Sequence, residues 1–238
     1  MTNEYTSRTE LLLGADGLAR LAEARVAIFG LGGVGSFAAE ALVRAGICRF
    51  LLVDHDTIAP SNLNRQLHAT RKTVGQKKTE AMRARMLEIN PNADIEVIDA
   101  FYEPGHADEF FHVPLDYIID AVDTVTAKLS LVVEATRRNI PIVSSMGAGN
   151  KLEPTCFEVA DIYETCVCPL AKVMRKELKK RGVPHLKTVY SKETPIPAVV
   201  SENRHGRHAP GSVSFVPSVA GLILAGEVIR DLTGVKHQ

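Results

Sequence analysis

The sequence predicts an α/β fold: a doubly wound, mostly parallel sheet followed by a C-terminal strand and helix extension. Two observations support this prediction. Short apolar segments of strand length alternate with longer segments of helical periodicity over residues 25–146. The first apolar segment also runs directly into Gly30-Leu31-Gly32-Gly33-Val34-Gly35, and a helical pattern starts there. This order of strand, glycine turn and helix is typical of a Rossmann-like nucleotide-binding unit.

The individual elements follow from apolar spacing and from the Gly and Pro residues that end each segment. The expected strands are residues 25–30, 50–54, 95–98, 117–121 and 142–146, with 156–160 and 213–216 in the C-terminal part. The expected helices are residues 34–45, 76–90, 124–139, 169–181 and 218–232. Residues 8–23 are expected to form two short helices because Gly14 and Gly17 interrupt the pattern.

Length and composition are those of an ordinary globular protein. The 238 residues are expected to form one domain, 1–238, with a nucleotide-binding core over 1–150 and an extension over 151–238. The 28 basic residues balance the 28 acidic ones, so net charge points to no partner. The polar N-terminus and the Pro-containing uncharged stretch 209–226 predict no secretory signal and no membrane span. Four cysteines without a Cys-x-x-Cys motif predict neither zinc nor disulfides, and hence a cytoplasmic location.

The glycines have separate expected roles. Gly30 permits the turn, Gly32 lets the backbone approach a phosphate, and Gly35 lets the helix pack close to the strand. Asp54 ends the second strand, 19 residues after Gly35, and is placed to accept hydrogen bonds from a ribose. The glycine motif alone fits a dinucleotide as well as a mononucleotide. An NAD-dependent oxidoreductase or a redox-sensing binding module is therefore an alternative class.

The residues after the second strand favour a polyphosphate. Residues 56–75 form an unusually long connection, which includes Asn62 and Arg65, and Lys78 follows at the start of the next helix. Arg65 suits phosphate oxygens through two parallel N–H bonds, Lys78 is a mobile point charge, and Asn62 is an uncharged donor. Such a set suits an enzyme that breaks a triphosphate. The alternative is an ordinary solvated loop and helix surface.

A second carboxylate follows the fourth strand. Asp123 stands at the carboxyl edge of the predicted sheet, where open α/β sheets bind ligands. It could hold magnesium on phosphates, because Mg²⁺ usually takes one or two carboxylates together with phosphate oxygens. Asp123 could equally cap the helix that starts at Thr124, and the two roles are compatible.

Together these motifs resemble the ubiquitin-activating-type adenylating enzymes, which include the bacterial sulfur-carrier adenylyltransferases. The matching motifs fall within residues 8–159: Gly30-x-Gly32-Gly33-x-Gly35, Asp54-x-Asp56, Ser61-Asn62-x-Asn64-Arg65-Gln66, Gly75-x-x-Lys78 and Ala121-Val122-Asp123. The resemblance implies ATP and Mg²⁺, and leaves a monovalent cation (Na⁺ or K⁺) open. It implies the ribose at Asp54, the phosphates at Asn62, Arg65 and Lys78, and magnesium at Asp123. The implied nucleotide-binding set also contains Gly30, Gly32, Gly33, Gly35, Asp56 and Gln66.

The resemblance also implies a homodimer. In the family an arginine near the N-terminus reaches the active site of the other subunit, and Arg8 occupies the matching place. The implied catalytic residues are therefore Arg8, Arg65, Lys78 and Asp123, with residues 151–238 providing substrate and dimer contacts. Without the resemblance, Arg8 is an ordinary surface charge. A sulfur-relay partner, which the family sometimes has, stays open.

A narrower similarity extends to the C-terminal part. Asn64-Arg65-Gln66-Leu67-His68-Ala69, Gly147-Ala148-Gly149, Pro154-Thr155, Asp161 and Val189-Tyr190-Ser191-Lys192-Glu193 are similar to family members that act on threonylcarbamoyladenosine in tRNA. The implied reaction is its ATP-dependent dehydration, by cyclisation through a carboxyl adenylate. The alternative is adenylation of the C-terminus of a small ubiquitin-like sulfur carrier. Many carrier-activating members have two Cys-x-x-Cys zinc pairs, which this chain lacks.

Three further features leave alternatives open. The predicted helix 169–181 has six basic residues and one acid, so its polar face either tracks RNA phosphates or is simply solvated. Cys168 at its start is either a reactive thiol or a structural one. Lys128, one turn beyond Asp123, is placed near an incoming carboxylate.

Overall fold

The computed structural model describes residues 4–197, 203–204, 207–208 and 210–235. Its centre is a seven-stranded sheet in the order β3-β2-β1-β4-β5-β7-β6. The strands are β1 (Arg25–Phe29), β2 (Arg49–Val53), β3 (Asp94–Ile98), β4 (Tyr117–Asp120), β5 (Ile142–Ser145), β6 (Phe157–Asp161) and β7 (Lys187–Ser191). Within this sheet every neighbouring pair is parallel except β6 with β7. The mostly parallel α/β sheet that the sequence predicts is confirmed.

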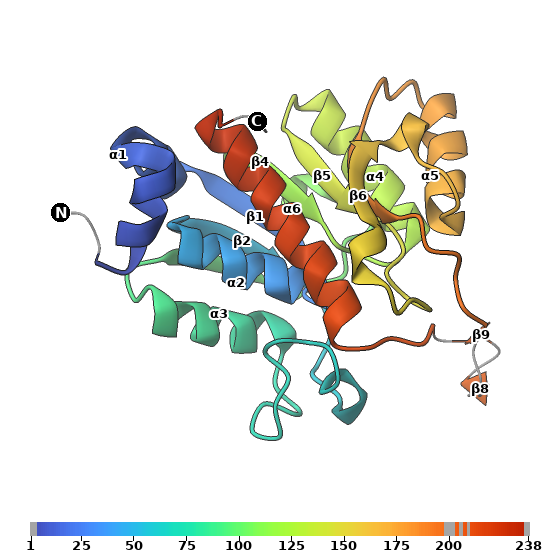
Figure 1. The fold of residues 1–238 in the computed structure, drawn as a ribbon, viewed down its shortest axis with the longest axis horizontal. Coiled ribbons are helices and arrows are strands. Elements are labelled where there is room, and N and C mark those ends of the chain that lie inside the picture. Colours follow the sequence, from blue (N-terminus) through green and yellow to red (C-terminus); the bar gives the residue numbers. More distant parts are fainter. Residues whose placement is uncertain (1–3, 198–202, 205–206, 209, 236–238) are drawn as a thin grey trace.

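Helices cover both faces of this sheet (Figure 1). The helices α1 (Ser7–Glu23), α2 (Gly35–Ala45), α3 (Lys78–Ile89) and α6 (Phe215–Thr233) share one core with alternate residues of the central strands, including Val26 and Ile28. The intervening residues Ala27 and Phe29 face the other side, where α4 (Val125–Arg137) packs. Helix α5 (Pro169–Lys180) packs against α4. Because successive residues of a central strand enter the cores on opposite faces, both faces are buried and these strands are apolar throughout.

The order of the strands creates a crevice above the centre of the sheet. The chain leaves β1 through α2 on one face and leaves β4 through α4 on the other, while β1 and β4 are neighbours. The connections therefore diverge at the carboxyl ends of these two strands. In open α/β sheets this switch point is where ligands bind.

The C-terminal part differs from the sequence prediction in two places. Residues 213–216 were expected as a strand, but Phe215 and Val216 begin helix α6, which lies beside α2 in Figure 1. Pro217 lies in the first turn of α6, where no intrahelical N–H bond is lost. The sequence prediction also lacked β7, which pairs with β5 and β6 and contains buried Thr188 and Ser191. Because these buried residues are polar, the segment lacks the continuous apolar run by which a buried strand is recognised in a sequence.

Elsewhere the expected elements agree with the structure within a few residues. Helix α1 is broken at Gly14, which has φ +71°, whereas Gly17 is part of the helix, so only the first of the two predicted interruptions exists. Gly46 ends α2 in the left-handed conformation, as expected for a helix C-terminus. Within the described residues we find no helix with both the length and the apolar composition that a membrane span requires.

Candidate active site

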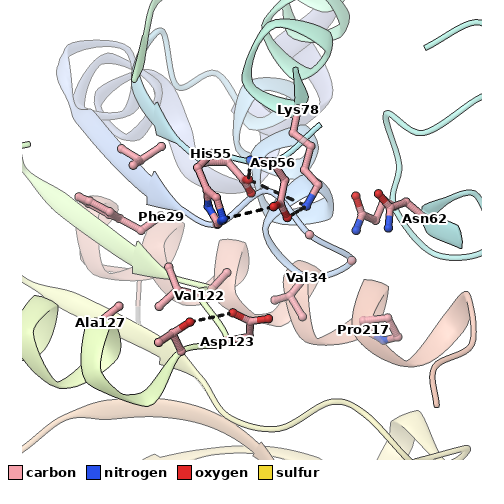
Figure 2. A pocket seen from close by; sticks show the side chains of 18 of the residues that line it. Phe29, Val34, His55, Asp56, Asn62, Lys78, Val122, Asp123, Ala127 and Pro217 are labelled. Atoms are coloured by element: carbon pink, nitrogen blue, oxygen red, sulfur yellow. Dashed lines mark hydrogen bonds and ion pairs between the residues drawn. The ribbon is translucent and has the colours of Figure 1, made fainter. Parts of the chain in front are cut away.

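A cavity of about 410 Å³ lies at the switch point between β1 and β4. Its walls come from segments that are far apart in the sequence: the glycine turn, the end of β2, the long connection before α3, the start of α3, and the connection between β4 and α4 (Figure 2). The expected site residues that line it are Gly30, Gly32, Gly33, Asp54, Asp56, Asn62, Arg65, Gln66, Lys78 and Asp123. The structure thus brings together Asn62, Arg65 and Lys78 with Gly32 and Asp123 around one cavity.

The glycine turn forms one wall of this cavity. Gly30 has φ +89°, and an added Cβ would lie 2.7 Å from the carbonyl oxygen of Ala121. Gly35 lies below the turn and outside the cavity lining, where a Cβ would lie only 1.9 Å from the Gly30 oxygen. A Cβ on Gly32, in contrast, would meet no atom within 4 Å. Gly30 and Gly35 are therefore required by packing, whereas Gly32 leaves open space beside the backbone.

Asp54 connects the end of β2 to the glycine turn. Its carboxylate accepts a 2.6 Å hydrogen bond from the backbone N–H of Leu31 and a 2.8 Å bond from the N–H of Asp56. Burial and these two bonds fix the side chain at the cavity wall. Each carboxylate oxygen keeps a free lone pair, so Asp54 can still accept a hydroxyl.

Lys78 is the buried cation of the cavity. Its side chain is 6% exposed, and its Nζ donates a 2.5 Å bond to Asp56 Oδ2 and lies 3.9 Å from Asp54 Oδ1. The Asp56 side chain is 50% exposed, so this pair joins a buried ammonium to a solvated carboxylate. Figure 2 shows the pair across the cavity from Asp123. A buried ammonium needs such a partner because an isolated buried charge is costly.

The long connection after β2 places two further donors. Asn62 Oδ1 accepts a 3.0 Å bond from the N–H of Ala59, which leaves its amide group available as a donor. Arg65 Nη1 donates to the carbonyl of Ser61 and to Asn64 Oδ1 at 3.0 and 2.9 Å. Asn64 in turn donates to the Ser212 carbonyl, tying this connection to the segment before α6. The connection is held in place at the cavity, although it has little regular structure.

Asp123 stands at the rim, and its carboxylate accepts one 3.3 Å bond from the Thr124 hydroxyl. The N-cap residue of α4 is Thr124, so the capping role considered for Asp123 is wrong. An exposed carboxylate beside a polyphosphate-sized cavity fits the oxygen ligands that Mg²⁺ prefers. Ligand atoms of Asp54, His55 and Asp56 also lie within 4.8 Å of one another. The Lys78 ammonium already supplies a positive charge to that group.

A buried network beneath the rim was missed by sequence reasoning. Asp120, at the end of β4, accepts a 2.5 Å bond from Ser144 Oγ and a 3.0 Å bond from Lys128 Nζ. Lys128 also donates to the carbonyl of Val122, which lines the cavity. The placement of Lys128 near an incoming carboxylate is therefore wrong, because its side chain is fully buried in this network. Its effect is to hold the 120–123 segment in place.

The opposite wall comes from the C-terminal part of the chain. Ala148 and Gly149 follow β5, and Pro210, Ser212 and Pro217 precede or begin α6. The sequence identified Gly147-Ala148-Gly149 only through a resemblance. The contribution of the segment before α6 had no local signal, since it depends on where α6 crosses the sheet.

Three expected features lie outside the cavity. Arg8 is exposed near the start of α1 and does not line this cavity. Cys168 is buried in the core between α4 and α5, so its role here is packing, whereas Cys166 is exposed. His68 is 3% exposed, and neither ring nitrogen has a hydrogen-bond partner among the described residues. Burial, with Lys78 and Arg85 nearby, lowers the pKa of His68 to about 4, so the ring is neutral at pH 7.

The fold and the cavity together are those of a nucleotide-binding α/β protein. The chain belongs to the ThiF family, which it matches over residues 6–238. It is 46% identical over 239 residues to the tRNA threonylcarbamoyladenosine dehydratase of Bacillus subtilis, a match that covers 95% of this chain and 93% of that protein.

Solved structures agree with this relationship. The crystal structure of the Escherichia coli tRNA N6-threonylcarbamoyladenosine dehydratase has a TM-score of 0.89 and 32% sequence identity, and covers 97% of this chain and 94% of that chain. Its complex with ATP gives a TM-score of 0.88 at 32% identity, with the same coverage of both chains. The molybdopterin-synthase adenylyltransferase of Escherichia coli is more distant: it is 34% identical over 146 residues, which are 61% of this chain and 58% of that protein.

Proposed function

We propose that this enzyme dehydrates threonylcarbamoyladenosine in tRNA at the expense of ATP. The observation that carries the proposal is the set of Asn62, Arg65 and Lys78 facing the glycine turn around one cavity, in a chain with 46% identity to a named dehydratase of this nucleoside. The relatives solved with ATP and with AMP bound support a reaction that converts one into the other. Loss of AMP from an activated carboxylate is the chemistry that links these two nucleotides.

The reaction has two steps. A carboxylate oxygen of the threonine group attacks the α-phosphorus of ATP, the bond to the β-phosphate breaks, and pyrophosphate leaves. The carbamoyl group of the same nucleoside then attacks the activated carbonyl carbon and gives up a proton, and AMP leaves with the carboxylate oxygen that bridged carbon and phosphorus. Because the nucleoside supplies its own nucleophile, no enzyme nucleophile is needed, and the nucleoside loses one water in total.

The side chains act by position and charge. Asp54 holds the ribose, the backbone at Gly32 approaches the phosphates, and Asn62 donates its amide hydrogens to them. Arg65 and Lys78 counter the negative charge that shifts toward pyrophosphate as the bond breaks. When the phosphates bind Lys78, the solvated Asp56 can release it at little cost, because Asp56 is half exposed.

Asp123 is the residue proposed to hold magnesium. Bound there, Mg²⁺ would neutralise phosphate charge and orient the α-phosphate. A monovalent cation, also raised by the family resemblance, stays a prediction; a requirement for Na⁺ or K⁺ in the assay is its test.

The remaining assignments follow the family resemblance. We propose one domain with a nucleotide-binding core over residues 1–150, an extension over 151–238 for substrate and dimer contacts, and a homodimer. Arg8 is proposed to act in the partner subunit's cavity, which accords with its position away from its own cavity. A sulfur-relay partner and a cytoplasmic location stay predictions. A mixed dimer of R8A and K78M chains tests the dimer: activity restored by mixing two inactive variants supports it.

Activation of a small sulfur-carrier protein is the second candidate function. It is favoured only by the more distant similarity to the molybdopterin-synthase adenylyltransferase. The test is to incubate the enzyme with ATP, Mg²⁺ and threonylcarbamoyladenosine-containing tRNA, and to measure nucleoside mass. A mass lower by one water supports the dehydratase. An unchanged mass, with ATP–pyrophosphate exchange only in the presence of a carrier protein, supports the alternative.

A further inference from the structure

The exposed side of helix α5 carries a concentration of positive charge that lies outside the cavity lining. The helix and its C-cap, residues 169–181, contain six basic residues and one acid, whereas the whole chain has 28 of each sign. Ala171, Met174 and Leu178 are buried against α4. Lys172, Lys176 and Lys179, at positions i, i+4 and i+7, are exposed together on the opposite side. These three lysines are called the α5 basic face below.

The three lysines of the α5 basic face differ from the other basic residues of the helix, which have partners in the protein. Lys180 and Arg181 both pair with Glu177, at 2.7 and 2.8 Å. Arg175 is anchored by hydrogen bonds to Thr165. For Lys172, Lys176 and Lys179, no carboxylate of the described residues lies within ion-pair distance. Lys187, near the same stretch of sequence, is instead paired with Asp231 at 2.6 Å and belongs to another cluster.

Helix α5 also starts next to the cavity. A Cβ on Gly147 would lie 3.7 Å from Cys168 Sγ and 4.0 Å from Leu170 Cβ, so the first turn of α5 packs on the segment that continues into Ala148 and Gly149. These two residues line the cavity. At about 1.5 Å rise per residue, the three lysines then extend over roughly 10 Å of helix leading away from that wall.

We infer that the α5 basic face binds the phosphate backbone of the RNA whose nucleoside enters the cavity past Ala148 and Gly149. This inference rests on the proposed function and names the surface that binds the tRNA. Lysines suit phosphates as flexible point charges, and phosphate contacts fix position without reading sequence. An acidic protein partner is less favoured, because protein interfaces are depleted in lysine and place apolar residues at their centre.

Val173 is apolar, yet its side chain is 44% exposed and lies beside the α5 basic face rather than on the buried side of the helix. Four further basic residues in the sequence, Arg204, His205, Arg207 and His208, have side chains outside the described part of the chain. The inference therefore uses only Lys172, Lys176 and Lys179.

The test is tRNA binding by the triple variant K172E/K176E/K179E over a series of salt concentrations. Releasing about three phosphate contacts should make the slope of log affinity against log salt shallower by about two. The KM for tRNA should rise at least tenfold, with ATP affinity and kcat at saturating tRNA unchanged. Arg20, Arg49 and Arg83 are exposed on α1, the start of β2 and α3, so R20E/R49E/R83E is a control with the same charge change.

The outcomes separate the two proposals. An unchanged tRNA affinity and salt slope in the lysine variant overturns the α5 inference, and so does an equal loss in the arginine control. The neutral variant K172Q/K176Q/K179Q, with a circular dichroism spectrum like the wild type, guards against misfolding and should lose affinity in the same direction. If the wild type leaves threonylcarbamoyladenosine intact while binding tRNA through these lysines, the proposed reaction fails and the RNA surface stands.

Discussion

The ammonium of Lys78 lies 2.5 Å from the carboxylate of Asp56, with the lysine buried and the aspartate half exposed. The pair keeps a cation at the cavity without the cost of an isolated buried charge. The cation also lines the same cavity as Gly32 and Asn62, where the proposed function puts the phosphates. The geometry of this pair leads directly to the first prediction.

Lys78→Met removes the buried cation of the cavity. We expect the rate of AMP formation to fall by about 100-fold to 1000-fold, as is usual when one group that stabilises developing charge is lost. The measurement is AMP release from ATP with threonylcarbamoyladenosine-containing tRNA. Lys77→Met is the matched control, because Lys77 is exposed, pairs with Asp99 at 3.0 Å and does not line the cavity. Equal losses in both variants would contradict the assignment.

Arg65→Lys keeps the charge and removes the planar guanidinium. The loss of at least one charge-assisted hydrogen bond should weaken ATP binding about tenfold or more. Isothermal titration calorimetry with ATP and Mg²⁺ measures this directly. Arg71→Lys, on the exposed part of the same connection, should bind ATP like the wild type. ATP affinity that is the same in the Arg65 variant would remove Arg65 from the phosphate site.

Two glycine variants should separate packing from phosphate approach. Gly35→Ala pushes a methyl group to 1.9 Å from the Gly30 oxygen and should cost about 3 kcal/mol of unfolding free energy. Gly32→Ala meets no atom within 4 Å, so its stability should stay near that of the wild type while ATP binding is lost. Urea unfolding and nucleotide titration together measure both effects. A stable Gly32 variant that binds ATP normally would show that the phosphates lie elsewhere.

The buried pair of Lys128 and Asp120 is predicted to be structural. Lys128→Met leaves Asp120 buried without its cation and should cost about 3–5 kcal/mol of unfolding free energy. The double variant D120N/K128M removes both charges and should recover much of that stability and of the activity. Denaturant unfolding followed by the AMP assay checks this. If the double variant is as stable as the wild type and still inactive, Lys128 has a direct part in the chemistry.

His68 makes stability depend on pH. Its pKa is lowered to about 4 in the folded protein, against an ordinary value near 6.5, so the unfolded chain takes up the proton first as pH falls. The stability due to neutral His68 is complete above pH 6.5 and is lost as pH falls toward 4. At pH 5 the wild type should have lost about 2 kcal/mol more than His68→Gln, relative to pH 7.5. The measurement is urea unfolding of both proteins at both pH values. An equal change in unfolding free energy from pH 7.5 to pH 5 in the two proteins would contradict this.

Much of the fold was predictable because local signals and tertiary packing agree. The glycine turn, the Asp54 strand end and the start of α3 each have a short-range sequence pattern, and the structure brings these segments to one cavity. Strand β7 was not predictable in this way, since buried Thr188 and Ser191 take their hydrogen bonds or packing from distant segments. Residues 213–216 looked like a strand, but Phe215 and Val216 instead begin α6, which packs across the sheet.

The site shows the same division. Asn62, Arg65, Lys78 and Asp123 were predicted from residue type and position to share one site, and all four line the cavity. The burial of Lys128 was not predicted, since it depends on Asp120, eight residues earlier at the end of β4, which is itself buried by the packing of the sheet. The contribution of Pro210 and Ser212 to the wall depends on where the segment before α6 passes, which no local pattern reports.

The most direct measurement follows the oxygen atoms of the substrate. The substrate is tRNA in which both carboxylate oxygens of threonylcarbamoyladenosine are labelled with the heavy isotope of oxygen. It is incubated with the enzyme, unlabelled ATP and Mg²⁺, and the masses of AMP and of the product nucleoside are measured by mass spectrometry. Activation through a carboxyl adenylate at this cavity predicts one heavy oxygen in each AMP and one in the cyclised nucleoside. AMP that contains only ordinary oxygen, or a wild-type enzyme that forms no AMP with this substrate, would contradict it.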